Sequence, residues 1–205
     1  PVVVHVLYDN CEGNISMAQI EDGLRVLNED FRRTNADTAL TRAPFKDVAV
    51  DSDIEFRLAK LDPDGNPTNG VVRIQTEQAV DAYQNVKSLS YWPSDQYMNI
   101  WIVESIQNFT GSGGTILGYA QFPGSGSWNT YGFVVRNDAF GVIGTSNADG
   151  RTVTHEIGHC LNLYHTFQGG CGNYCSNSGD YVCDTPPASG ATYNCSSTTN
   201  TCGND

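Results

Sequence analysis

One segment constrains the fold of this chain more than any other: residues 155–165 read HEIGHCLNLYH. On an α-helix, residues four apart differ by about 40° of rotation and about 6 Å of rise, so the imidazoles of His155 and His159 can face one metal ion. Glu156, turned by about 100° from His155, can reach a water molecule on that ion rather than the ion itself. This HExxH spacing predicts a zinc-binding helix with Glu156 as the general base.

The third histidine of the segment requires the helix to end. On a continued helix His165 would lie about 15 Å along the axis from His155, too far for both to bind one ion. Asn162 can end the helix, because Asn is, after Gly, the commonest residue in the left-handed conformation that terminates helices. We therefore expect one zinc ion bound by His155, His159 and His165. The opposite face of the helix carries an apolar stripe that can pack in a core, formed by Val153, Ile157, Cys160 and Leu161.

Length and charge exclude several classes of protein. A chain of 205 residues can bury the core of one sizeable domain, or of two lobes around a cleft. Its formal net charge of -12 argues against nucleic acid and anionic membrane as partners, since basic patches bind both. The sequence has no apolar stretch of about 18 residues and no signal-peptide pattern. We expect no membrane-spanning segment, and any targeting segment to have been removed.

The cysteines indicate an oxidising compartment. Five of the seven lie between Cys171 and Cys202, which favours a loop region held by disulfides and a secreted, extracellular protein. A second zinc site is a weaker alternative, because the spacings do not form paired CxxC units. The odd number leaves one thiol over. Either Cys160 is a free thiol in the core, or one cysteine pairs with polypeptide outside this chain.

Hydrophobic periodicity predicts an α/β fold. Residues 2–8 form a β-rich run, in which the isolated His5 is expected to be a strand residue rather than a metal ligand. A helix with Ser16 as its N-cap is expected next, because one apolar stripe contains Ile20, Leu24, Leu27 and Phe31. Together with the zinc helix, the pattern predicts a mixed sheet covered by two helices. Five further strands are predicted, at 54–61, 70–74, 98–103, 117–122 and 131–136. The first two flank an acidic turn and form a hairpin or an adjacent pair.

The zinc segment resembles the extended motif HExxHxxGxxH of the metzincin metallopeptidases, with Asn162 in place of Gly. Among metzincins it is most similar to the pappalysin family, because the motif continues as YHTFQGGC at 164–171. Later pieces, GD at 179–180 and DTP at 184–186, are similar as well. Upstream, GYAQFP at 118–123 and NEDFRRTN at 28–35 also resemble that family. The resemblance touches most of the chain and is dense over residues 117–186.

This resemblance implies a metzincin-like fold: a mixed, mostly parallel twisted sheet with a backing helix and an active-site helix, followed by an irregular, disulfide-stapled lobe. The implied division is an upper subdomain at about 1–161 and the start of a lower subdomain at about 162–205. The strand at 117–122 would form the rim of the cleft and bind substrate by strand addition through Leu117, Gly118, Tyr119 and Ala120. For any one of these residues, a place in an ordinary sheet strand is an equally good interpretation. A structural calcium ion is implied near Asp180, Cys183, Asp184 and Thr185.

One departure from the family concerns methionine. Metzincins have a tight turn with a Met beneath the metal, after the zinc motif, whereas this chain has only Met17 and Met98, both upstream. We therefore expect a truncated or nicked product that ends before that turn and lacks its C-terminal remainder. The remainder and a removed pro-segment, implied by the resemblance, are expected partners.

The sequence thus favours a secreted zinc-dependent endopeptidase. Its substrates would be extended proteins or peptides, cleaved by a zinc-bound water that Glu156 activates. Two alternatives stay open: a catalytically inactive, zinc-containing extracellular binding module, and a non-peptidase zinc hydrolase. Zinc content without cleavage of unfolded protein would favour the first, and a peptide-library assay would identify the second.

Overall fold

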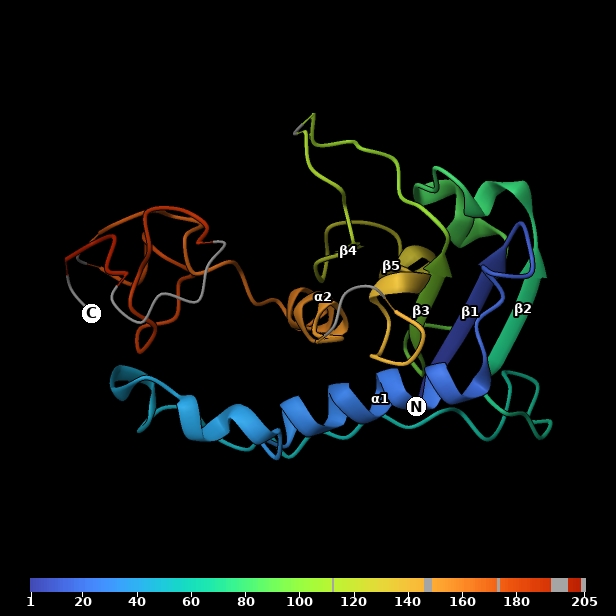
Figure 1. The fold of residues 1–205 in the computed structure, drawn as a ribbon, viewed down its shortest axis with the longest axis horizontal. Coiled ribbons are helices and arrows are strands. Elements are labelled where there is room, and N and C mark those ends of the chain that lie inside the picture. Colours follow the sequence, from blue (N-terminus) through green and yellow to red (C-terminus); the bar gives the residue numbers. More distant parts are fainter. Residues whose placement is uncertain (112, 146–148, 173, 193–198, 204–205) are drawn as a thin grey trace.

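The computed structural model describes residues 1–111, 113–145, 149–172, 174–192 and 199–203. Its centre is a five-stranded sheet with the order β2-β1-β3-β5-β4 (Figure 1). Four strands run parallel, and β4 pairs antiparallel with β5 at one edge. This confirms the mixed, mostly parallel sheet expected from the sequence. The strands are β1 (Val2–Tyr8), β2 (Val71–Gln75), β3 (Met98–Val103), β4 (Gly118–Ala120) and β5 (Gly132–Arg136).

Two α-helices, α1 (Met17–Phe31) and α2 (Thr152–Cys160), pack on one face of this sheet (Figure 1). Helix α1 begins as predicted, because the Ser16 Oγ atom accepts a hydrogen bond of 3.1 Å from the Gln19 N–H. Helix α2 buries most of its apolar stripe in the same core, but Leu161 is 42% exposed. Leu161 was expected in the stripe and instead forms the C-cap, where the helical spacing ends. Short 3₁₀ turns complete the described elements: η1 (Ala36–Leu40), η2 (Ala43–Phe45), η3 (Glu77–Ala79), η4 (Gln84–Ser88), η5 (Trp128–Thr130) and η6 (Asn137–Ala139).

The other face of the sheet is covered by the segment that contains η3 and η4 rather than by an α-helix. A buried lysine lies there: Lys87 Nζ donates a hydrogen bond of 2.8 Å to the Thr130 carbonyl and sits 5.2 Å from the Trp101 ring centroid. Burial lowers the pKa of Lys87 to about 8. Lys87 thereby fastens the loop between β4 and β5 to the back of the sheet.

His5 is a strand residue, as predicted. It is fully buried in β1, where its Nε2–H donates to Asn99 Oδ1 at 2.9 Å and its Nδ1 accepts from Ser90 Oγ at 2.8 Å. The Asn99 Oδ1 atom also accepts from the Trp92 N–H, which fixes the orientation of the amide. Burial lowers the pKa of His5 to about 4, so the ring is neutral near neutral pH.

The predicted strand at 54–61 is wrong. That segment makes only single bridges, from Leu58 to Val2 and from Leu61 to Pro67. The reason lies in β1, whose edge is paired with β2 from Val4 onward, so the segment can reach only the first residue of the strand. The acidic stretch that follows is a turn, as expected, because the Asp62 carboxylate accepts hydrogen bonds from the Asp64 and Asn66 N–H groups.

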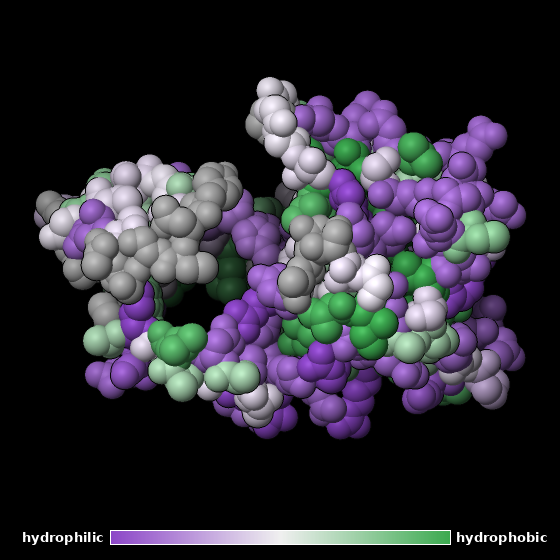
Figure 2. Space-filling model, in the orientation of Figure 1, coloured by the Kyte–Doolittle hydropathy of each residue, from purple (hydrophilic) through white to green (hydrophobic). Residues whose placement is uncertain are grey.

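The described residues after α2 contain no helix or strand. Two disulfides, Cys171–Cys202 and Cys175–Cys183, cross-link this C-terminal region, which confirms the disulfide-held loops. Cys160 is a buried free thiol and Cys11 an exposed one, while Cys195 lies outside the described residues. Figure 2 shows a hollow between the C-terminal region and the rest of the molecule. Among the described residues, no helix has both the length and the apolar character needed to cross a bilayer.

Candidate active site

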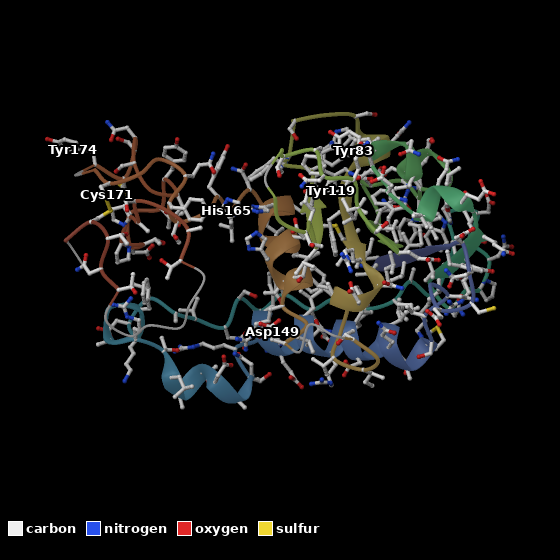
Figure 3. The ribbon with its side chains drawn as sticks, turned by 45° about the horizontal axis from the view of Figure 1, so that its top comes forward. Tyr83, Tyr119, Asp149, His165, Cys171 and Tyr174 are labelled. Carbon is white, nitrogen blue, oxygen red and sulfur yellow. A yellow bond between two sulfur atoms is a disulfide. The ribbon has the colours of Figure 1, made fainter. Side chains whose placement is uncertain are left out.

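Three imidazoles meet beside α2: those of His155 and His159, which lie on the helix, and that of His165, which follows it and is labelled in Figure 3. The Nε2 atom of His159 lies 3.0 Å from that of His155 and 3.2 Å from that of His165. The Nε2 atoms of His155 and His165 are 3.1 Å apart. The structure therefore brings all three predicted zinc ligands together, with one nitrogen of each ring directed at a common point.

The turn that places His165 is the one expected from Asn162, which adopts φ 70°. The Asn162 N–H donates to the His159 carbonyl at 3.0 Å, and the Leu163 N–H donates to the Gly158 carbonyl at 2.9 Å. These two bonds form a Schellman motif, which satisfies carbonyls at the end of the helix. The left-handed residue thus reverses the chain within three residues and returns His165 to the first two histidines.

The donor set fits a zinc ion. Zinc bound tetrahedrally to imidazole nitrogens at about 2.0–2.1 Å keeps those nitrogens about 3.3–3.4 Å apart, close to the separations found here. The Nδ1–H of His159 donates to the Leu163 carbonyl at 2.7 Å, which leaves the Nε2 lone pair of the neutral ring free to bind a metal. Partial burial, followed by repulsion from the other two rings, lowers the pKa of His155 to about 4. His155 is therefore neutral, as a metal ligand must be.

Glu156 lies beside this cluster in an unusual environment. Its side chain is 5% exposed, and none of the described residues donates a hydrogen bond to its buried Oε2 atom. Burial raises the pKa of Glu156 to about 8, so the carboxyl group takes up a proton readily. A bound metal cation would counter this effect by favouring the ionised form. A buried carboxyl group directly after His155 in the chain, whose Oε2 atom has no hydrogen-bond partner among the described residues, is suited to moving a proton.

The edge strand β4 lies directly against Glu156. A Cβ atom at Gly118 would approach both Oε1 and Cγ of Glu156 to 3.0 Å, so a glycine leaves the room that this carboxyl group occupies. The Leu117 carbonyl accepts from the Arg136 N–H at 2.9 Å, and the Gln121 N–H donates to the Gly132 carbonyl at 3.1 Å.

These two bonds determine which residues of β4 pair with β5 and which face the free edge of the sheet. Residues 117, 119 and 121 direct their main-chain groups at β5, and Gly118 and Ala120 direct theirs at the free edge. Of the four residues predicted to bind substrate, Gly118 and Ala120 therefore have their main-chain groups on the free edge, whereas those of Leu117 and Tyr119 face β5. Substrate binding by these residues stays a prediction. The Tyr119 ring packs on the face of the sheet that η3 and η4 cover, away from α2, and burial there raises the pKa of its hydroxyl group.

The predicted calcium residues lie in the disulfide-linked C-terminal region. Cys183, Asp184 and Thr185 line a cavity of about 380 Å³. Asp180 does not line it, and its carboxylate accepts a hydrogen bond of 3.0 Å from the Val182 N–H. Among the described residues, the three histidines form the only group of His, Cys, Asp and Glu side chains close enough to hold one ion. Calcium binding stays a prediction.

Sequence reasoning missed three features of the site. The Leu163 carbonyl orients His159, and Gly118 makes room for Glu156. Phe122 lies with its ring centroid 5.0 Å from that of His159. The only sequence signal for Gly118 and Phe122 is their place in the GYAQFP stretch.

This chain is similar to several known proteins. Residues 81–205 match the Peptidase M43 family, described as pregnancy-associated plasma protein-A. An extracellular metalloprotease of Pyricularia oryzae is 30% identical over 191 residues, covering 89% of this chain and 53% of the relative. One from Colletotrichum graminicola is 31% identical over 205 residues, covering 95% of this chain and 60% of the relative. The chain thus spans between half and two thirds of the length of these curated relatives.

Two solved structures are also similar, and this chain covers a larger share of each than of the two curated relatives above. Tannerella forsythia mature mirolysin in complex with a cleaved peptide has a TM-score of 0.78 and 41% identity, covering 92% of this chain and 71% of mirolysin. Promirolysin from the same organism has a TM-score of 0.76 and 41% identity, covering 91% of this chain and 62% of promirolysin. Figure 1 shows the fold of this chain, a sheet with α1 and α2 on one face and an irregular C-terminal region beyond them.

Proposed function

Because this chain belongs to the M43 peptidases, the pappalysin family of the metzincins, we propose that it is a secreted zinc-dependent endopeptidase. The observation that carries the proposal is the convergence of three imidazole nitrogens beside a buried glutamate that has no hydrogen-bond donor on Oε2 among the described residues. Three neutral imidazoles leave a fourth position on zinc, as in catalytic rather than structural sites. His155, His159 and His165 would hold the ion.

The chain's own residues supply the proton transfers. Bound zinc would polarise the scissile carbonyl and lower the pKa of water from about 15.7 towards about 7. Glu156 takes a proton from the attacking water as the oxygen bonds to the carbonyl carbon. It then returns that proton to the amine nitrogen as the C–N bond breaks, so one carboxyl group serves as base and then as acid. The absence of a competing donor on Oε2, among the described residues, keeps this oxygen available.

The proposed substrates are extended polypeptides. The free edge of β4 offers the main-chain groups of Gly118 and Ala120, to which a peptide can pair by strand addition. This pairing requires an extended chain but no particular sequence, and it places the substrate next to Glu156, which Gly118 contacts. The complex of mirolysin with a cleaved peptide supports the same class of substrate.

Further proposals rest on similarity. The relatives named extracellular metalloproteases, together with the two disulfides, support secretion. The solved promirolysin supports a removable pro-segment. We also propose the division at about 161/162 and a structural calcium ion beside Cys183, Asp184 and Thr185. Calorimetric titration with CaCl₂ would test the last point, and the same heat from an Asp184→Asn variant would refute it.

The test of the central proposal combines cleavage with metal analysis. Denatured casein should be cleaved by the protein, and a zinc chelator should abolish cleavage until zinc is restored. Glu156→Gln should keep bound zinc and lose most cleavage, by a factor on the order of 10² or more for loss of the general base. Glu21→Gln, on the exposed face of α1, is the matched control and should behave as the unmodified protein.

Each other outcome has a meaning. Undiminished turnover by Glu156→Gln would remove Glu156 from the mechanism. Stoichiometric zinc without cleavage of any unfolded protein would favour the zinc-containing binding module. Cleavage of esters or of small amides, with no activity on a peptide library, would favour the non-peptidase hydrolase.

A further inference from the structure

Three aromatic rings form a continuous stack beside the histidines. The Phe122 and Tyr164 ring centroids are 4.9 Å apart and the rings nearly parallel, at 29°. Tyr181 meets Tyr164 edge-on, with centroids 5.4 Å apart and an angle of 85°. The rings come from three segments: the residues just after the edge strand β4, the turn after α2, and the disulfide-linked region. Tyr164 is 36% exposed and Tyr181 48% exposed, so the stack is open to solvent.

The stack is continuous with the candidate active site. The Phe122 ring lies 5.0 Å from the His159 ring, and Tyr164 directly precedes His165 in the chain. Phe122 also follows Ala120, whose main-chain groups face the free edge of β4, by two residues. A strand advances about 3.3 Å per residue, so a peptide paired with Gly118 and Ala120 reaches the stack about two residues further along.

We propose that Phe122, Tyr164 and Tyr181 form a platform that binds an aromatic or large apolar side chain of the peptide substrate. The bound side chain lies two or three residues from the scissile bond, on one side of it. This inference rests on the proposed endopeptidase function and specifies the substrates of that site.

The chemistry of the three rings identifies the occupant. Main-chain pairing with β4 is independent of sequence, so any preference among peptides must come from side-chain contacts. The stack offers ring faces and edges rather than a charged group, and aromatic side chains pack on such surfaces through offset or edge-to-face contacts. Each aromatic pair of this kind is worth roughly a factor of 2 to 10 in affinity beyond the area buried. A shallow, open aromatic surface beside a peptide-binding edge therefore favours peptides with a nearby aromatic residue.

A structural role for the rings is the competing explanation. Phe122 contacts the imidazole of His159, and the stack could serve only to hold that ring in place. This alternative makes a different prediction, because a displaced His159 would slow the cleavage of every peptide by the same factor. A binding platform affects only those peptides that carry the aromatic residue.

The experiment compares two peptides that differ at one position. A peptide library is first cleaved with the unmodified protein to find positions at which aromatic residues are enriched. A matched pair, with Phe or Ala at the enriched position, is then used to measure kcat/KM for the unmodified protein, Phe122→Ala, Tyr181→Ala and Tyr174→Ala. Tyr174 is 71% exposed, and Figure 3 shows it at the far end of the C-terminal region from His165, so it serves as the control. Zinc content is measured for every variant.

The platform predicts that the unmodified protein prefers the Phe peptide by about tenfold and that Phe122→Ala removes most of this preference. Tyr181→Ala should reduce the preference partly, and Tyr174→Ala should leave it intact. Calorimetric binding of the same two peptides to Glu156→Gln, which should not turn them over, should show the same ratio.

Two results would overturn the inference: no aromatic enrichment in the library, or equal losses on both peptides in Phe122→Ala. If the protein cleaves no peptide at all, the proposed function fails first. Binding of peptide pools with and without Phe to Glu156→Gln then still tests the platform by itself, and equal affinity for the two pools would refute it.

Discussion

The left-handed turn at Asn162 allows a quantitative test of how the site is assembled. Replacing Asn162 with Val puts a β-branched residue at φ 70°, a conformation that Asn adopts readily but that costs Val about 1–2 kcal/mol or more. In the metal-free variant the turn can relax, which releases the two Schellman hydrogen bonds and moves His165 away from His155 and His159. Zinc must then restore the strained turn when it binds. A cost of about 2 kcal/mol corresponds to a loss of about 30-fold in zinc affinity.

The assay is a competition titration of zinc against a chromophoric chelator. Asn162→Gly should keep the affinity within about threefold, because Gly adopts the left-handed conformation without steric cost. Asp81→Val is the matched control: Asp81 has φ 54° in an exposed loop, so the substitution introduces a similar strain without touching a histidine. This control should lower the unfolding temperature and leave zinc affinity unchanged.

The comparison can fail in two ways. Equal zinc affinities for Asn162→Val, Asn162→Gly and the unmodified protein would show that the turn does not determine the position of His165. A similar loss in Asp81→Val would show that general destabilisation, rather than local geometry, controls metal binding.

Two further predictions concern the room beside Glu156 and the buried His5. Gly118→Val should retain zinc but lower kcat roughly 100-fold, because its Cβ atom would displace the Glu156 carboxyl group. This Cβ atom would lie 3.0 Å from Glu156 Oε1 and 3.1 Å from the Val134 carbonyl oxygen, and an unchanged kcat would contradict the prediction. His5 has its pKa lowered to about 4 against about 6.5 in the unfolded chain, so its contribution to stability is complete above pH 6.5 and is lost as the pH falls towards 4. The free energy of unfolding should fall by about 3 kcal/mol over this pH range. Denaturant unfolding of His5→Gln should show a smaller fall between pH 6.5 and 4, and the same fall as in the unmodified protein would contradict this role of His5.

Some parts of the fold could be read from local sequence. The strands at 2–8 and 98–103 were predicted to the residue, because both are continuous apolar runs suited to a buried parallel sheet. The capping residue Ser16 and the left-handed Asn162 were predicted from backbone chemistry that acts within a few residues. These features depend on the residues themselves more than on distant parts of the chain.

Other parts depend on packing between distant segments. The alternation at 54–61 is typical of a strand, yet nothing in that segment shows that β2 occupies the edge of β1. The contact of Gly118 with Glu156 joins residues 38 positions apart, and the stack of Phe122 on Tyr164 joins residues 42 positions apart. Local periodicity contains no information about such pairs.

The exposed edge of β4 also bears on the solubility of the protein. Unpaired main-chain groups at a sheet edge can template a strand from another copy of the same chain, which is a route to aggregation. Here β4 is only three residues long and its free groups belong to Gly118 and Ala120, so a second copy could form only a short ladder. The formal net charge of -12 adds repulsion between copies at long range. The free edge is thus too short to join two copies of the chain stably.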